Sequence, residues 1–171
     1  MAKTMILAIG GAGCSMAETI MREASAHWVR EAAYLFADSD QASLAELAQK
    51  GYQTISLNGN ENPCEVIKGV EKLYLLVGMG GKTGSEYVNI VANAAKAAGV
   101  QDVSAIVTVP FYFEGEGKIV KAKEAIKSLK GVKTKVLHND DLLENYDDIN
   151  FATAFNYADL SALKAIESGE I

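Results

Sequence analysis

The sequence predicts an α/β fold: a doubly wound, mostly parallel sheet of Rossmann-like type with helices on both faces. Two observations predict it. Short apolar runs alternate with helical patterns along the 171 residues. Turns rich in glycine or acidic residues follow several of these runs, where a parallel sheet carries its ligand-binding loops. Because crossovers between parallel strands are right-handed, we expect helices on both faces.

Each element follows from its own residues. Apolar, β-branched and aromatic residues predict buried strands over residues 4–9, 33–37, 53–57, 72–77, 103–109 and 134–137. Helical periodicity predicts helices over about 14–30, 41–50, 64–69, 85–98 and 118–130, and a final helical region that opens at 139–141 and reaches over 152–166. Ser39 or Asp40 would cap the second helix, and Gly99 and Gly131 would end the fourth and the fifth.

Composition indicates one ordinary globular domain. Apolar residues make up 49% of the chain and charged residues 22%, a balance typical of soluble proteins. The net charge of −6 argues against non-specific binding to nucleic acid or to an anionic membrane. Two cysteines, Cys14 and Cys64, are too few for a disulfide framework. No apolar stretch is long enough to span a membrane, so we expect a cytoplasmic protein with reduced thiols.

The first glycine cluster, Gly10-Gly11-Ala12-Gly13, separates the first strand from the first helix. Glycines let backbone N–H groups approach an anion closely, and the helix N-terminus favours negative charge. The match to the dinucleotide fingerprint is incomplete, because Met16 stands where the third small residue belongs. Asp38, at the end of the second strand, would still suit a ribose, so an NAD(P)-binding Rossmann domain stays open at this point.

A second glycine cluster, residues 78–84, follows the fourth strand. It is not a Walker A loop, since that pattern would need glycine where Leu76 stands. Ordering four glycines in seven residues costs chain entropy, which indicates that the backbone of this segment has a role that requires glycine. Two such loops, each feeding a helix N-terminus, would surround one polyphosphate from two sides.

Six segments resemble motifs of the tubulin and FtsZ superfamily, in the family's order and over nearly the whole chain. They are GGAGCS at 10–15, NPCEV at 62–66, GGKTGS at 80–85, TVPFYFEG at 108–115, NDDLL at 139–143 and AFNYAD at 154–159. The corresponding family patterns are GGAGxN, NPEV, GGGTG[ST]G, TxPFxFEG, NDxLL and AFxxAD. The chain therefore resembles the GTP-binding domain of the bacterial cell-division protein FtsZ.

The resemblance implies that residues 1–171 form a single nucleotide-binding domain for GTP or GDP. The phosphates would be held by Gly10, Gly11, Ala12, Gly13, Cys14, Gly80, Gly81, Lys82, Thr83 and Gly84. Glu114 would contact the ribose together with Lys118, which stands where the family uses arginine. Asn139 and Asp159 would recognise the guanine edge, and Phe155 would stack on the ring. A Mg²⁺ ion would accompany the phosphates, although the sequence shows no dedicated ligand for it.

The chemistry agrees with a guanine site. A carboxylate such as that of Asp159 accepts hydrogen bonds from both N1–H and the 2-amino group of guanine. Adenine offers no such pair of donors, and leaving a buried carboxylate unpaired costs on the order of 1–3 kcal/mol or more. Taken singly, Asp159, Asn139 and Phe155 would fit equally well as surface, capping and core residues.

The chain departs from the family at three places. Lys82 replaces a glycine, where it would contact phosphate, crowd the loop or point to solvent. Ser15 replaces the usual asparagine, and residues 38–40 read DSD where the family has NTD. After Asp159 nothing resembles the family's catalytic loop NxDxxD, so the resemblance names no catalytic residue here.

These departures define the functional expectation and its alternatives. We expect weak or no GTP hydrolysis by this chain alone, with contact to an FtsZ-type filament, as a cap or modulator, or self-association. One alternative is an NAD(P)-binding Rossmann domain, which would show no preference for guanine. The other is a non-catalytic module that keeps the FtsZ fold for protein contacts and responds to no nucleotide.

Overall fold

The computed structural model describes residues 3–59, 61–145 and 150–169. Six parallel strands form one sheet in the order β3-β2-β1-β4-β5-β6. The strands are β1 (Thr4–Ile9), β2 (Ala33–Asp38), β3 (Thr54–Ser56), β4 (Lys72–Gly78), β5 (Asp102–Val109) and β6 (Lys133–His138). The doubly wound parallel sheet predicted from the sequence is therefore confirmed, and each of the six strands lies within about one residue of its predicted bounds.

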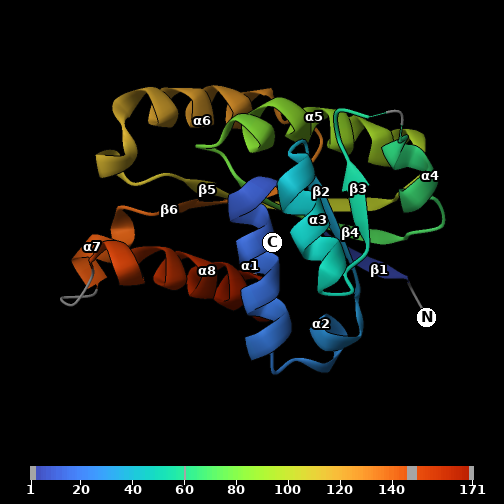
Figure 1. Cartoon of the computed structure of the whole chain (residues 1–171), viewed down its shortest axis with the longest axis horizontal. Helices are drawn as coiled ribbons and strands as arrows, with labels where there is room; N and C mark the ends of the chain where they lie inside the picture. The colour runs from blue at the N-terminus through green and yellow to red at the C-terminus, as the bar shows by residue number, and fades with distance from the viewer. Residues whose placement is uncertain (1–2, 60, 146–149, 170–171) are drawn as a thin grey trace.

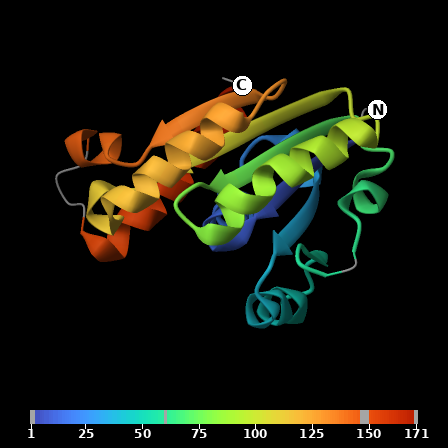
Figure 2. The ribbon, with the colours of Figure 1, turned by 90° about the horizontal axis from the view of Figure 1, so that it is seen from above.

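Helices cover both faces of this sheet (Figures 1 and 2). They are α1 (Gly10–Glu23), α2 (His27–Glu31), α3 (Gln41–Gln49), α4 (Pro63–Ile67), α5 (Lys82–Ala97), α6 (Glu116–Ser128), α7 (Asp141–Asn145) and α8 (Phe151–Ser168), with a 3-10 turn η1 (Tyr112–Glu114) after β5. In the described ranges no helix combines the length and the apolar character needed to cross a membrane.

Alternation along the strands produces two hydrophobic cores. Met5, Leu7 and Ile9 of β1 join a cluster with α4, α5 and α6, whereas Ile6 and Ala8 join a cluster with α1, α2 and α8. Successive side chains of a strand point to opposite faces, so a strand buried on both sides is a continuous apolar run. This explains why the strands were the most predictable elements.

The helix predicted over residues 14–30 is wrong at both of its ends. α1 begins four residues earlier, at Gly10, whose φ of 76° lets the chain turn directly out of β1. The helix then stops at Glu23, and α2 forms separately. At the break, Ser25 donates from its backbone N–H and its hydroxyl to the Glu167 carboxylate on α8, at 2.9 and 2.8 Å. This tertiary contact takes the place of helical hydrogen bonding.

Parallel register brings the ends of four strands to one edge of the sheet. Ile9 pairs with Val77, Gly78 with Thr108, and Val109 with His138. Since the chain leaves each strand at this edge, the starts of α1 and α5, the turn η1 and the residue Asn139 all gather there. The edge is where the sequence places its unusual loops.

Candidate functional site

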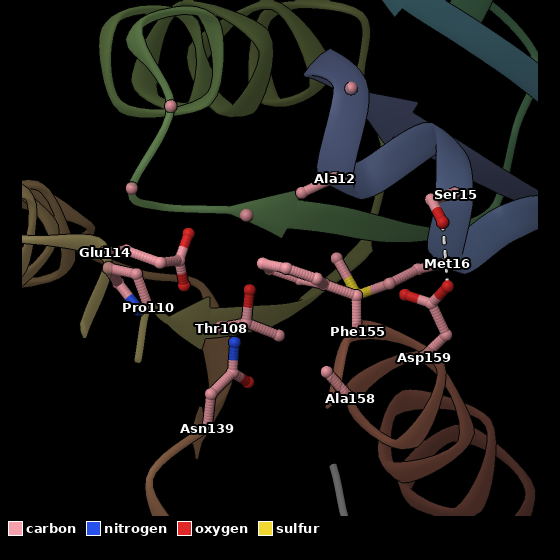
Figure 3. Close-up of a pocket in the computed structure, with 14 residues that line it drawn as sticks. Ala12, Ser15, Met16, Thr108, Pro110, Glu114, Asn139, Phe155, Ala158 and Asp159 are labelled. Atoms are coloured by element: carbon pink, nitrogen blue, oxygen red, sulfur yellow. Dashed lines mark hydrogen bonds between the residues drawn. The ribbon is translucent and has the colours of Figure 1, made fainter. Parts of the chain in front are cut away.

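A cavity of about 340 Å³ opens at this carboxyl edge (Figure 3). Its lining comes from both glycine clusters, from the segment after β5 and from α8. It comprises Gly11, Ala12, Ser15, Met16, Gly78, Gly80, Gly81, Thr108, Pro110, Glu114, Asn139, Phe155, Ala158 and Asp159. Eight of the predicted site residues are thus brought together around one cavity: Gly11, Ala12, Gly80, Gly81, Glu114, Asn139, Phe155 and Asp159.

Some glycines of the two clusters leave the backbone open to the cavity, and others allow a helix to pack closely on β4. A Cβ added at Gly11 or Gly81 would meet nothing within 4 Å, so the backbone there is open to the cavity. A Cβ at Gly13 would lie 2.3 Å from the Leu76 carbonyl oxygen, and one at Gly84 would lie 2.3 Å from that of Gly78. Gly13 and Gly84 therefore let α1 and α5 pack directly on β4, which holds the open glycines in place.

Both helices that point into the site have N-termini without a side-chain cap. The residues preceding α1 and α5, Ile9 and Gly81, make no side-chain cap hydrogen bond, and neither first turn contains an acidic residue. By contrast, Asp40 caps α3 and Asn62 caps α4 through side-chain oxygens. An uncapped first turn leaves backbone N–H donors and the positive end of the helix dipole for an anion.

One aromatic ring, that of Phe155, lines the cavity, and Phe111 supports it from behind. Phe111 is fully buried, and the Phe113 ring stacks on it with a centroid distance of 4.8 Å. Phe155 meets Phe111 edge-on at 5.7 Å and remains 47% exposed. Edge-to-face packing fixes the ring of Phe155 without covering both of its faces. This arrangement leaves an aromatic surface on the cavity against which a flat ring can stack.

Asp159 is the most buried acid of the cavity lining, and α1 holds it. Its Oδ2 accepts hydrogen bonds from Ser15 Oγ at 2.7 Å and from Thr19 Oγ1 at 3.2 Å. Burial raises the pKa of Asp159, and the two hydroxyls and the charge of Arg22 oppose this rise. The residue is 9% exposed, so its carboxylate is partly desolvated before any ligand binds.

Two further polar residues approach the cavity from the segments after β5 and β6. Glu114 closes the turn η1, where its Oε2 accepts the Phe111 backbone N–H at 2.7 Å. Asn139 is 6% exposed, and its own backbone N–H donates to the Val109 carbonyl oxygen at 3.1 Å. Each residue is thus held by a hydrogen bond to the backbone of a neighbouring segment, and both line the cavity.

Other predicted site residues lie outside the cavity lining. Gly10, Gly13 and Gly84 stand at the packed helix starts. Thr83 turns its hydroxyl to Ser39 Oγ, 2.9 Å away. Cys14 faces the core, where burial raises the pKa of its thiol to about 12. Lys118 lies exposed in the first turn of α6. The side chain of Lys82 lies outside what the structure describes, so its contact with phosphate remains a prediction.

Six residues of the cavity lining were not among the predicted site residues: Ser15, Met16, Gly78, Thr108, Pro110 and Ala158. Four of them, Ser15, Thr108, Pro110 and Ala158, lie within segments that resemble family motifs, and this was the signal available for them. Gly78 belongs to the second glycine cluster, and Met16 follows Ser15 on α1. Within the described ranges, no group of three or more His, Cys, Asp or Glu side chains is placed to hold a metal ion.

The raised pKa of Asp159 predicts a pH-dependent cost to stability. The folded state binds this proton more tightly than the unfolded chain does, so the cost is absent below the ordinary value of 3.8 and grows as pH rises through the raised pKa. We expect Asp159→Asn to melt at a higher temperature than the wild type at neutral pH. The difference should shrink as pH falls toward 3.8 in a thermal-melting series. A variant that melts at a lower temperature than the wild type at neutral pH would contradict a raised pKa of Asp159 in the folded protein.

Comparisons with known proteins agree with the geometry. No protein-family model matches the chain. FtsZ from Mycoplasmopsis pulmonis is 28% identical over 179 residues, covering 92% of this chain and 45% of the relative. FtsZ from Neisseria gonorrhoeae is 30% identical over 177 residues, covering 90% of this chain and 44% of the relative. The chain therefore spans less than half the length of these curated relatives.

Solved structures show the same fold. A mutant FtsZ from M. jannaschii superposes with a TM-score of 0.75 at 24% identity, over 96% of this chain and 55% of that one. CetZ2 from Haloferax volcanii, solved as a GTPγS-bound protofilament, gives 0.71 at 17% identity, over 96% and 57%. The chain belongs to the tubulin/FtsZ superfamily, and it corresponds to part of the domain structure of its members. Within that superfamily, the curated relatives named above are FtsZ proteins.

Proposed function

We propose that this chain is an FtsZ-like cell-division protein segment that binds GTP or GDP in the cavity at the carboxyl edge, and that residues 1–171 act as a single nucleotide-binding domain. One observation carries the proposal: open glycine backbone and two uncapped helix N-termini lie at one end of the cavity, and a buried carboxylate beside an exposed aromatic ring lies at the other. The first end suits phosphate and the second suits a purine with two donors.

Among the described residues, the phosphate end offers backbone groups rather than cationic side chains. The described side chains that line the cavity include two acids, Glu114 and Asp159, and neither lysine nor arginine. Backbone N–H groups of α1 and α5 are therefore the donors that we assign to the phosphates. A Mg²⁺ ion bound mainly by the phosphates would offset the remaining negative charge, and this requires few protein ligands.

The base end supports a preference for guanine over adenine. Asp159 is buried, and a carboxylate can accept hydrogen bonds but not donate them. A base that presents two adjacent donors is therefore favoured over one that presents none. Phe155 would stack on the base, and Asn139 would complete the contacts with its edge. Glu114, which lines the cavity beside Pro110 in Figure 3, would then contact the ribose.

A thermal-melting series tests this function against its alternatives. With Mg²⁺ and a nucleotide at about a hundred times its dissociation constant, binding adds roughly 2.7 kcal/mol of stability. For a chain of this size we expect the melting temperature to rise by about 5–10 °C with GTP and GDP and to stay unchanged with ATP and NAD. A rise with NAD alone would favour the NAD(P)-binding alternative. No rise with any of them would contradict nucleotide binding and favour the protein-contact module.

Hydrolysis by this chain alone is expected to be slow or absent. The two acids of the described cavity lining, Asp159 and Glu114, are assigned above to the base and the ribose. A group that orients or deprotonates water must instead lie beside the terminal phosphate. We therefore assign binding, rather than turnover, to these residues.

A contact between this face and another FtsZ-type chain is the second part of the proposal. Tyr112, Phe113 and Phe155 are 66%, 43% and 47% exposed around the cavity, an apolar surface that favours protein contact. The CetZ2 relative was solved as a protofilament. Co-sedimentation with a full-length FtsZ tests the contact, whether the chain caps the filament or modulates it. Unchanged pelleting and turnover of the filament would contradict it.

A further inference from the structure

The two carboxylate oxygens of Asp159 have different surroundings. Oδ2 accepts the hydroxyls of Ser15, at 2.7 Å, and of Thr19, at 3.2 Å. The bonded oxygen faces α1 in Figure 3, whereas the other oxygen points along the cavity toward Phe155. The helix α1 therefore uses one edge of the carboxylate and leaves the other edge to the cavity.

We propose that Ser15 and Thr19 are positioning residues for base recognition: they hold the Asp159 carboxylate so that its second oxygen faces a guanine edge. The inference rests on the proposed function and deepens it, because it assigns the orientation of the recognising group to two hydroxyls on another helix. Ser15 stands where the family pattern has asparagine, so the serine hydroxyl is a departure from that pattern.

The geometry of the helices makes the two hydroxyls act together. Ser15 and Thr19 are four residues apart on α1, so their side chains lie on the same face, one turn apart. On α8, Ala158 and Ala162 are small and buried, which lets α8 approach α1 closely. Asp159 is thereby brought within hydrogen-bond distance of both hydroxyls from a position 140 or more residues away in the chain.

A carboxylate needs this support more than most side chains. The terminal torsion of Asp is broad rather than confined to three narrow wells, so packing alone does not fix the direction of its oxygens. Two charge-assisted hydrogen bonds to one oxygen select one orientation, with no need for the ligand to supply it. Preorganisation of this kind favours the ligand whose donors match the direction of the open oxygen.

The same hydroxyls favour the ionised form of Asp159. Burial raises its pKa, and the Ser15 and Thr19 hydrogen bonds and the charge of Arg22 on α1 lower it. Glu114, on η1 across the cavity, is the other acid of the lining. Removing a hydroxyl therefore leaves a carboxyl that protonates at higher pH, and a protonated carboxyl presents an O–H to the donors of guanine.

The test compares Ser15→Ala and Thr19→Val with Ser15→Thr, which keeps the hydroxyl. For each we measure the dissociation constants of GTP and ATP, the pH at which GTP affinity falls by half on the acid side, and the pKa of Asp159 in the nucleotide-free protein by carboxyl NMR. We expect Ser15→Ala to weaken GTP binding about tenfold, to leave ATP binding unchanged, and to move the acid midpoint and the pKa upward. Ser15→Thr should restore all three properties.

The outcomes separate this inference from the proposed function. Equal weakening of GTP and ATP, or unchanged GTP affinity in Ser15→Ala, would overturn the positioning role while leaving nucleotide binding in place. Loss of GTP affinity with an unchanged pKa and an unchanged pH midpoint would also overturn it, as a packing effect. A wild-type chain that binds no guanine nucleotide would instead overturn the proposed function, and the inference with it.

Discussion

Gly13→Ala is expected to lower the free energy of unfolding by about 2 kcal/mol and the melting temperature by about 4–8 °C. A Cβ at this position would lie 2.3 Å from the carbonyl oxygen of Leu76 and 3.2 Å from its carbonyl carbon, both in the backbone of β4. Backbone atoms at the centre of a parallel sheet have little room to move, so α1 must shift instead. Overpacking is expected to destabilise the fold by about 3 kcal/mol, and the higher helix propensity of alanine offsets up to about 1 kcal/mol of this loss.

Gly11→Ala is the matched control for this effect. It lies two residues earlier in the same first turn of α1, and a Cβ there would meet nothing within 4 Å. Helix propensity should leave this variant as stable as the wild type or slightly more stable. Chemical denaturation of the three proteins measures the difference. If Gly11→Ala and Gly13→Ala were equally stable, the close packing of α1 on β4 would be wrong.

Asp159→Asn is expected to reduce GTP affinity by about 100- to 1,000-fold and to remove the preference for GTP over ATP. The substitution keeps the size of the side chain and replaces one acceptor by an NH₂ donor. If the amide oxygen stays with Ser15 and Thr19, as Oδ2 does, the NH₂ group faces the base. It would then oppose the N1–H and 2-amino donors of guanine.

The same variant offers a gain of function that a damaged protein would not show. Xanthine carries a carbonyl oxygen where guanine carries the 2-amino group, and this oxygen accepts from the new NH₂ group. We therefore expect xanthosine triphosphate to bind Asp159→Asn more tightly than GTP does, with the order reversed in the wild type. Fluorescence titration of both proteins with GTP, ATP and xanthosine triphosphate measures these affinities. Unchanged GTP affinity in the variant would show that Asp159 does not recognise the base.

The sheet could be predicted from the sequence because each strand carries its own signal. Runs such as residues 4–9 and 103–109 are mostly apolar and almost wholly buried, and this pattern is local. The break after α1 could not be predicted, because it depends on Ser25 bonding to Glu167, 142 residues later in the chain. The early start of α1 could not be predicted, because glycine locally favours a loop, whereas close packing on β4 requires glycine within this helix.

Part of the cavity lining could be predicted as a set of residues, whereas the contacts that these residues make could not. Resemblance to family motifs pointed to Phe155 and Asp159, and the structure places both on the cavity. Sequence could not distinguish the open Gly11 from Gly13, because both belong to one cluster and differ only in what lies beneath them. The partnership of Ser15 with Asp159 joins residues 144 positions apart and has no local signature.

The contact of Gly13 and Gly84 with the carbonyl groups of β4 has a consequence for how this protein tolerates sequence change. The shape of this end of the cavity depends on contacts between backbone atoms, and the backbone is common to all amino acids. Exchange of the surrounding side chains leaves these contacts unaltered as long as the glycines persist. A chain only 28–30% identical to its curated relatives can therefore keep its helix starts at the sheet edge while most of its other residues differ.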